Sequence, residues 1–141
     1  MKIVRSILAI LAGTGAMFAF VEGIEYLLVV IISGADSADS EKYFAVRNQT
    51  GIITTKHFYN LMGGFIGGWV TCKIARYRLK THGLVLMGLQ VLSFIYAMTD
   101  PVMKTFAPQW AWISFGIVTL TGIWLGTNQV IRKQRLSIRT I

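Results

Sequence analysis

Long apolar runs separated by short polar segments dominate this chain. Four of them are long enough, or nearly so, to cross a bilayer as helices, because a helix rises about 1.5 Å per residue and the hydrocarbon core is about 30 Å thick. They cover residues 6–32, 57–75, 83–99 and 110–131. Lipid offers an irregular backbone no hydrogen-bond partner, and the alternating polarity of barrel strands is absent from these runs. The pattern therefore predicts an all-α membrane protein, with residues 1–141 forming a single transmembrane domain.

The connections between these runs predict how the helices are arranged. Short turns between the second and third runs, and between the third and fourth, make antiparallel neighbours of these helices. We therefore expect an antiparallel bundle of four transmembrane helices. The first run follows Lys2 and Arg5 as a signal peptide would, but it is too long for such a peptide, so we expect it to be retained as a helix.

The segment 33–56 is the one long connection, and it lies on the outer side of the predicted bundle. Its portion SADSEKYFAV is expected to form a short helix at the membrane interface. Asp36 or Ser37 would cap this helix, and Tyr43 and Phe44 would face lipid.

Charged residues are scarce, and their placement sets the orientation. Only 14% of the chain is charged and 54% is hydrophobic, whereas about a quarter of a soluble domain is charged. Ten of the 14 Lys and Arg residues fall on one side of the predicted bundle, with no acidic residue there. These ten are Lys2, Arg5, Lys73, Arg76, Arg78, Lys80, Arg132, Lys133, Arg135 and Arg139. Basic residues collect on the cytoplasmic side, so we expect both termini to be cytoplasmic. The net charge of +8 thus follows topology and does not indicate nucleic-acid binding.

Small residues recur at helical spacing in three of the four runs. They are Gly15, Ala19 and Gly23 in the first, Gly63, Gly64, Gly67 and Gly68 in the second, and Gly122 and Gly126 in the fourth. In lipid, such residues let helix backbones approach closely, as in GxxxG motifs. We expect these three helices to pack tightly and the third to lie at the periphery. Contact within the chain is the ordinary interpretation, and an oligomer contact is the alternative.

Glu22 and Glu25 are the sharpest chemical feature, because they interrupt the first apolar run. They lie about 15 Å and about 10 Å below its outer end and share one helical face. A charge at mid-bilayer costs about 3 kcal/mol or more, so such residues face the bundle or water and find partners. Two neighbouring carboxylates also repel, which favours protonation of at least one.

Polar residues at matching depths are the candidate partners. Asn60 lies at the level of Glu25, and Gln90 and Ser93 lie near mid-membrane. His57, at the outer end of the second run, is placed to pair with Glu25 if the two helices are adjacent. A functional interpretation makes this a proton or cation site that opens outward. The structural interpretation is a buried Glu pair held by polar residues or by another subunit.

No recognised catalytic, metal or cofactor pattern is present in the sequence. GxSxG, HExxH and phosphate-loop motifs are missing. His57 and His82 lie at opposite ends of the bundle, which leaves only a single-His or shared haem site. Cys72 has no second thiol to form a disulfide or a zinc site. We therefore expect no cofactor and no enzymatic activity.

The stretch from His57 to Lys133 resembles small uncharacterised bacterial four-helix inner-membrane proteins. The likeness lies in the Gly-rich second helix that ends in basic residues, GGFIGGWVTCKIAR, followed by a short third helix and a Trp-led fourth. It implies a topology and a location in the bacterial cytoplasmic membrane, and no activity.

Two functions are compatible with these patterns. Small size, short loops and abundant small-residue surfaces favour a non-catalytic accessory, assembly or structural subunit of a larger membrane complex. The alternative is a small proton- or cation-coupled transporter or channel component that uses Glu22 and Glu25. The expected partners are the lipid bilayer and other membrane subunits or further copies of the chain.

Overall fold

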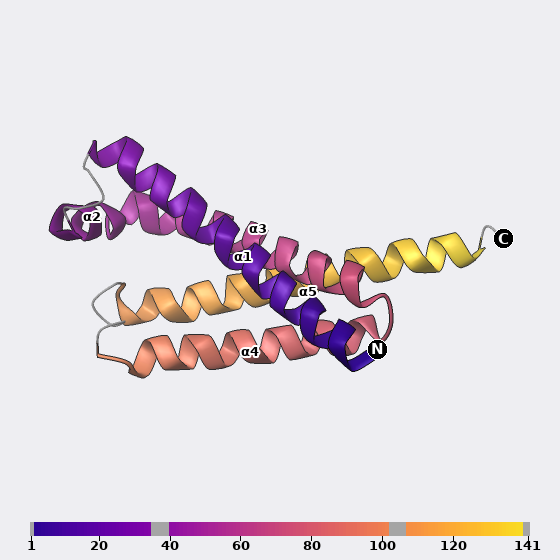
Figure 1. The fold of residues 1–141 in the computed structure, drawn as a ribbon. Coiled ribbons are helices and arrows are strands. Elements are labelled where there is room, and N and C mark those ends of the chain that lie inside the picture. Colours follow the sequence, from indigo (N-terminus) through magenta and orange to yellow (C-terminus); the bar gives the residue numbers. More distant parts are fainter. Residues whose placement is uncertain (1, 35–39, 102–106, 140–141) are drawn as a thin grey trace.

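Five helices make up the computed structural model, which describes residues 2–34, 40–101 and 107–139 (Figure 1). They are α1 (Lys2–Ser33), α2 (Ser40–Arg47), α3 (Thr50–Ala75), α4 (Leu79–Thr99) and α5 (Gln109–Arg139). All regular structure within the described ranges is helical, which confirms the all-α class. The four long helices run alternately in opposite directions along the bundle (Figure 1).

The helices are longer than the apolar runs. α3 begins at Thr50, seven residues before the predicted 57, and α5 continues to Arg139, eight residues past 131. Both extensions are polar, so hydropathy alone could not detect them. Part of the predicted loop 33–56 is therefore helical, as α2 and the first two turns of α3.

Three helices are long and apolar enough to cross a membrane: Lys2–Ile32, Leu79–Thr99 and Gln109–Leu136. α3 is less apolar, although its 26 residues exceed the length needed. Its position explains this composition. α3 packs against α5 on one side and α1 on the other, so less of its surface has to be apolar. α4 contacts mainly α5 and lies at the edge of the bundle. This peripheral position was predicted from its few small residues, of which Gly88 is one.

The contact between α3 and α5 depends on four glycines. A Cβ at Gly64 would collide with the carbonyl oxygen of Thr119, and one at Gly68 with that of Ile123. On the facing helix, Gly122 and Gly126 lie equally close to backbone atoms of α3. Such proximity is possible only without side chains, and it gives the two helices extensive van der Waals contact.

The small residues of α1 do not play this part, contrary to expectation. A Cβ at Gly15 or Gly23 would meet no atom within 4 Å, and Ala19 is exposed. The face of α1 that packs on α3 instead carries Gly13 and Met17. The reason is angular: residues 15, 19 and 23 repeat every four positions on a different side of the helix from 13 and 17.

α1 crosses the bundle obliquely and is held at both ends. At its N-terminal end, the Arg5 Nε donates a hydrogen bond of 2.7 Å to the Ile74 carbonyl, and the Ser6 hydroxyl lies 2.5 Å from that of Tyr77. Its C-terminal half diverges from α4 and α5, towards α2 and the start of α3 (Figure 1). The divergence leaves an open groove between α1 and α4, which we call the α1–α4 groove.

The predicted interfacial helix exists as α2, but it does not simply lie on lipid. Val46 is buried and Tyr43 is half-buried against the neighbouring helices. Asp36 and Ser37, the expected caps, lie outside the described residues, as does the side chain of Phe44.

Replacing one glycine from each set tests the packing. Gly126→Ala should lower the free energy of unfolding by about 1–3 kcal/mol, because the added methyl group would displace backbone atoms of α3. Gly15→Ala should leave it unchanged or raise it by about 0.5 kcal/mol through helix propensity. Unfolding in mixed detergent micelles, followed by tryptophan fluorescence, measures both. Equal effects of the two substitutions would contradict the described packing.

Candidate functional site

Glu25 is the centre of a buried charge cluster that joins three helices. Its side chain is 1% exposed and accepts contacts from two cations and a phenol. The Lys56 Nζ lies 2.6 Å from Oε2, and the Arg47 Nε forms an ion pair with Oε1. The Tyr59 hydroxyl donates a hydrogen bond of 2.8 Å to Oε2. Because Arg47 belongs to α2 and Lys56 and Tyr59 belong to α3, this carboxylate connects α1, α2 and α3.

The cluster explains why charged groups are tolerated here. Lys56 is buried, and its ammonium also lies 5.6 Å from the centre of the Phe115 ring, in a cation–π contact. Each cation thus has the carboxylate or an aromatic face in place of water. On α2, outside the membrane-spanning helices, burial and then the Glu25 carboxylate raise the pKa of Tyr43 above its ordinary value. Oε2 of Glu25 thus has both an ion pair and a hydrogen bond, whereas Oε1 has the ion pair with Arg47 alone.

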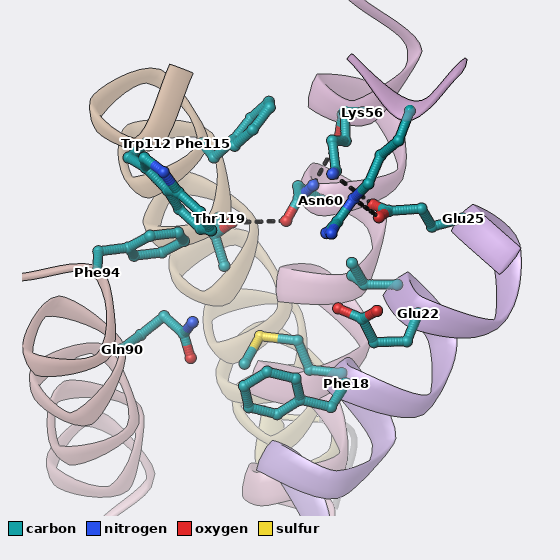
Figure 2. A pocket seen from close by; sticks show the side chains of 13 residues that line it. Phe18, Glu22, Glu25, Lys56, Asn60, Gln90, Phe94, Trp112, Phe115 and Thr119 are labelled. Atoms are coloured by element: carbon teal, nitrogen blue, oxygen red, sulfur yellow. Dashed lines mark hydrogen bonds and ion pairs between the residues drawn. The ribbon is translucent and has the colours of Figure 1, made fainter. Parts of the chain in front are cut away.

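Glu22 has a different environment although it lies only one turn away. Its side chain is exposed, and no hydrogen bond or ion pair joins it to any residue that the structure describes. Figure 2 shows its carboxylate pointing from α1 into the space that faces α4 and α5. The two glutamates, expected to act as a pair, have separate roles.

Polar groups from α3, α4 and α5 face Glu22 across this space. The Asn60 Nδ2 donates to the Lys56 carbonyl at 2.8 Å, and its Oδ1 lies 3.5 Å from the Thr119 hydroxyl. Gln90 is buried and points inward from α4 (Figure 2). Its amide makes no hydrogen bond with the described part of the chain. Among the described residues that line both spaces, Glu22, Gln90 and the indole Nε1 of Trp112 therefore have polar atoms available to a ligand.

Two connected spaces surround these groups. A small pocket of about 100 Å³ lies beside Glu22, Glu25, Asn60 and Gln90, which is room for a few water molecules. The α1–α4 groove, about 830 Å³, adjoins it. Six residues line both spaces: Phe18, Glu22, Arg47, Gln90, Phe94 and Trp112. The other residues that line the groove are mostly apolar. The groove is therefore a hydrophobic surface with polar side chains at its inner wall.

Two of the predicted site residues lie away from the pocket. His57 does not pair with Glu25, because its Nε2 lies 2.9 Å from the Ser114 hydroxyl and its Nδ1 lies 2.8 Å from the Ile53 carbonyl. Its ring also packs on Phe115, so it links α3 to α5. Ser93 is exposed and lines the groove rather than the pocket.

Comparisons with known proteins give no match. No family model, curated protein or solved structure is similar to this chain. The geometry of the site therefore carries the functional argument.

Metal and haem chemistry find no support in the arrangement of ligands. Within the described ranges, no three His, Cys, Asp or Glu side chains are grouped to hold a metal ion. His57 and His82 lie at opposite ends of the bundle, and each is hydrogen-bonded to a serine of another helix. Cys72 is buried near Leu79 in an apolar cluster.

Sequence reasoning missed the three partners of Glu25. Lys56 and Tyr59 are three residues apart on α3 and share a face. The predicted second helix begins after Lys56, because the charge of this residue ends the apolar run. Arg47 lies on α2, and the sequence alone does not indicate that this helix lies close to Glu25. The usable signal was chemical: a carboxylate within a membrane helix requires a cation, and few lie on the outer side.

Removing each carboxylate in turn should separate the two roles. Glu25→Gln leaves two buried cations without their counter-charge, so we expect it to lower the free energy of unfolding by about 3 kcal/mol. Glu22→Gln removes an exposed charge and should leave stability unchanged or higher. Thermal unfolding of the purified protein in detergent checks both. Equal destabilisation would show that Glu22 also has a structural partner.

Proposed function

We propose that this chain is a non-catalytic integral membrane protein of four spans that binds a transmembrane helix of a larger membrane complex in the α1–α4 groove. The observation that supports this most is the Glu22 carboxylate in an open groove, where no described residue forms a hydrogen bond or an ion pair with it.

The fourth span would be α3. Its 26 residues extend about 39 Å, which is sufficient for the hydrocarbon core. It lies between α1 and α5, antiparallel to α1 and parallel to α5, so it would cross the membrane together with them (Figure 1). With the ten basic residues gathered at one end, the positive-inside rule favours cytoplasmic termini. The resemblance to bacterial inner-membrane proteins suggests the bacterial cytoplasmic membrane as the location.

The depth of Glu22 follows from α4. This helix has 21 residues, about the number that spans the hydrocarbon core, and Gln90 is near its middle. Glu22 lines the same pocket as Gln90, so it lies close to mid-bilayer. A carboxylate there costs about 3 kcal/mol or more if it faces lipid. Binding of a partner that supplies a cation or hydrogen-bond donors would remove this cost.

A helix is the occupant that the surface favours. Gly15 and Ala19 are exposed on α1, on the same helix as five residues of the groove, and small residues allow close approach of another helix. The occupant would carry Lys, Arg or an amide side chain at the level of Glu22. Two copies of this chain facing each other through the groove would bring the two Glu22 carboxylates together, which disfavours self-association there.

A second candidate function is exchange of a proton or cation at Glu22. The 100 Å³ pocket holds water-sized space beside the Glu22 carboxylate and the Gln90 amide, and it opens into the groove. Glu25 would not take part, because two cations already neutralise it. This function predicts a chain that works without foreign subunits.

The test is co-purification of the tagged chain from native membranes in mild detergent. We expect a stable foreign membrane subunit with the unmodified chain, and loss of about 90% of it with Glu22→Gln, corresponding to a tenfold weaker complex. Leu92→Trp should also displace the partner by filling the groove.

Ile95→Trp is the matched control, because Ile95 is exposed on the same helix but does not line the groove. It should retain the partner. A pure homo-oligomer that takes up protons or cations in vesicles only with Glu22 present would favour the second candidate. Retention of the foreign subunit by both Glu22→Gln and Leu92→Trp would contradict the proposal.

A further inference from the structure

Two hollows flank the turn between α3 and α4, at the end of the bundle opposite the Glu25 cluster. The first, about 460 Å³, lies between α1 and α4, and the second, about 510 Å³, lies between α4 and α5. Both are lined by Tyr77, Arg78 and Thr81. Arg78 is therefore an exposed arginine that lies between the two hollows.

The first hollow has polar groups at its mouth and apolar groups below. Lys2 and Ser6 of α1 face Tyr77 and His82, and Ile10 lies deeper, where the hollow approaches the α1–α4 groove. The polar groups form a fixed network: His82 Nε2 lies 3.0 Å from the Ser6 hydroxyl, and the Tyr77 hydroxyl donates to the Lys2 carbonyl at 2.6 Å.

The second hollow is more basic. Lys80 and Arg135 join Arg78 there, and Leu79 and Ile131 provide an apolar floor. None of the described residues that line either hollow is acidic. Each hollow thus combines uncompensated positive charge with an apolar wall that leads into the membrane.

Both arginines of the turn have a left-handed backbone conformation, Arg76 as the C-cap of α3 and Arg78 as the N-cap of α4. Arg76 has φ 61° and Arg78 has φ 43°, in the left-handed region that favours glycine. A side chain there costs about 1 kcal/mol or more, and glycine would remove the strain. An arginine held in this conformation at the junction of two basic hollows indicates a use for the guanidinium, whose planar fork matches phosphate oxygens.

We propose that the two hollows bind one anionic lipid that carries two phosphates, with one phosphate in each hollow and Arg78 between them. Lys80 and Arg135 complete the second phosphate site, and Lys2 with the Thr81 hydroxyl completes the first. The acyl chains follow the apolar walls beside Ile10 and Ile131. The basic end of the bundle then does more than set topology: it selects a lipid. This inference is independent of what occupies the α1–α4 groove.

Native mass spectrometry of the full-length protein, titrated with cardiolipin or with phosphatidylglycerol at equal phosphate concentration, tests this site. We expect cardiolipin to bind about tenfold more tightly. Arg78→Gln should abolish this preference, and the double substitution Lys80→Gln with Arg135→Gln should reduce it. The double variant alters exposed side chains only, so it provides a second test if Arg78→Gln folds poorly.

Lys133→Gln is the matched control, since it removes one exposed positive charge at the same end of α5 outside both hollows. It should keep the preference for cardiolipin. Equal binding of the two lipids, or equal losses with Arg78→Gln and Lys133→Gln, would overturn the site in favour of diffuse attraction. If inorganic pyrophosphate bound as tightly as cardiolipin and displaced it, the lipid assignment would be wrong. The ligand of the site would then be a soluble diphosphate.

Discussion

The Glu25 carboxylate is the interaction on which the outer half of this structure depends. It takes the positive charges of Arg47 and Lys56 and the hydroxyl of Tyr59, so α2 and the start of α3 are held against α1 by one side chain. Buried ion pairs seldom add much net stability, but they allow few alternative arrangements, because each charge must meet its partner. The cluster therefore fixes the course of the outer half of α1.

The oblique course of α1 in turn creates the α1–α4 groove. α1 is fastened at its other end by the hydrogen bonds of Arg5 and Ser6 to the α3–α4 turn, and it packs along α3 between the two attachments. α4 contacts mainly α5 and has fewer contacts with α1. An oblique α1 and a peripheral α4 leave the space in which Glu22 lies. The ion-paired Glu25 thus positions Glu22, whose carboxylate faces the groove and is suited to a ligand.

The sequence predicted the helices and the importance of the glutamates, but not how they are divided. Hydropathy located the long helices because lipid demands apolar surfaces, and it failed at residues 50–56, where Ile52 and Ile53 are buried and the exposed threonines are polar. The glycines of α3 and α5 meet as predicted by their spacing, whereas Gly15 and Gly23 face open space, because spacing alone does not say which side of α1 a neighbour will occupy. The Arg47–Glu25 pair depends on the path of the chain between α1 and α2, which local patterns do not encode.

A photo-crosslinking amino acid at Phe18, which lines both the pocket and the groove, tests the central claim most directly in native membranes. The same substitution at Trp124, exposed on α5 but outside the groove, reports ordinary contact with lipid. A helix seated beside Glu22 predicts a discrete adduct with one other membrane protein from position 18 and lipid adducts alone from position 124. Lipid adducts alone from both positions would contradict the account.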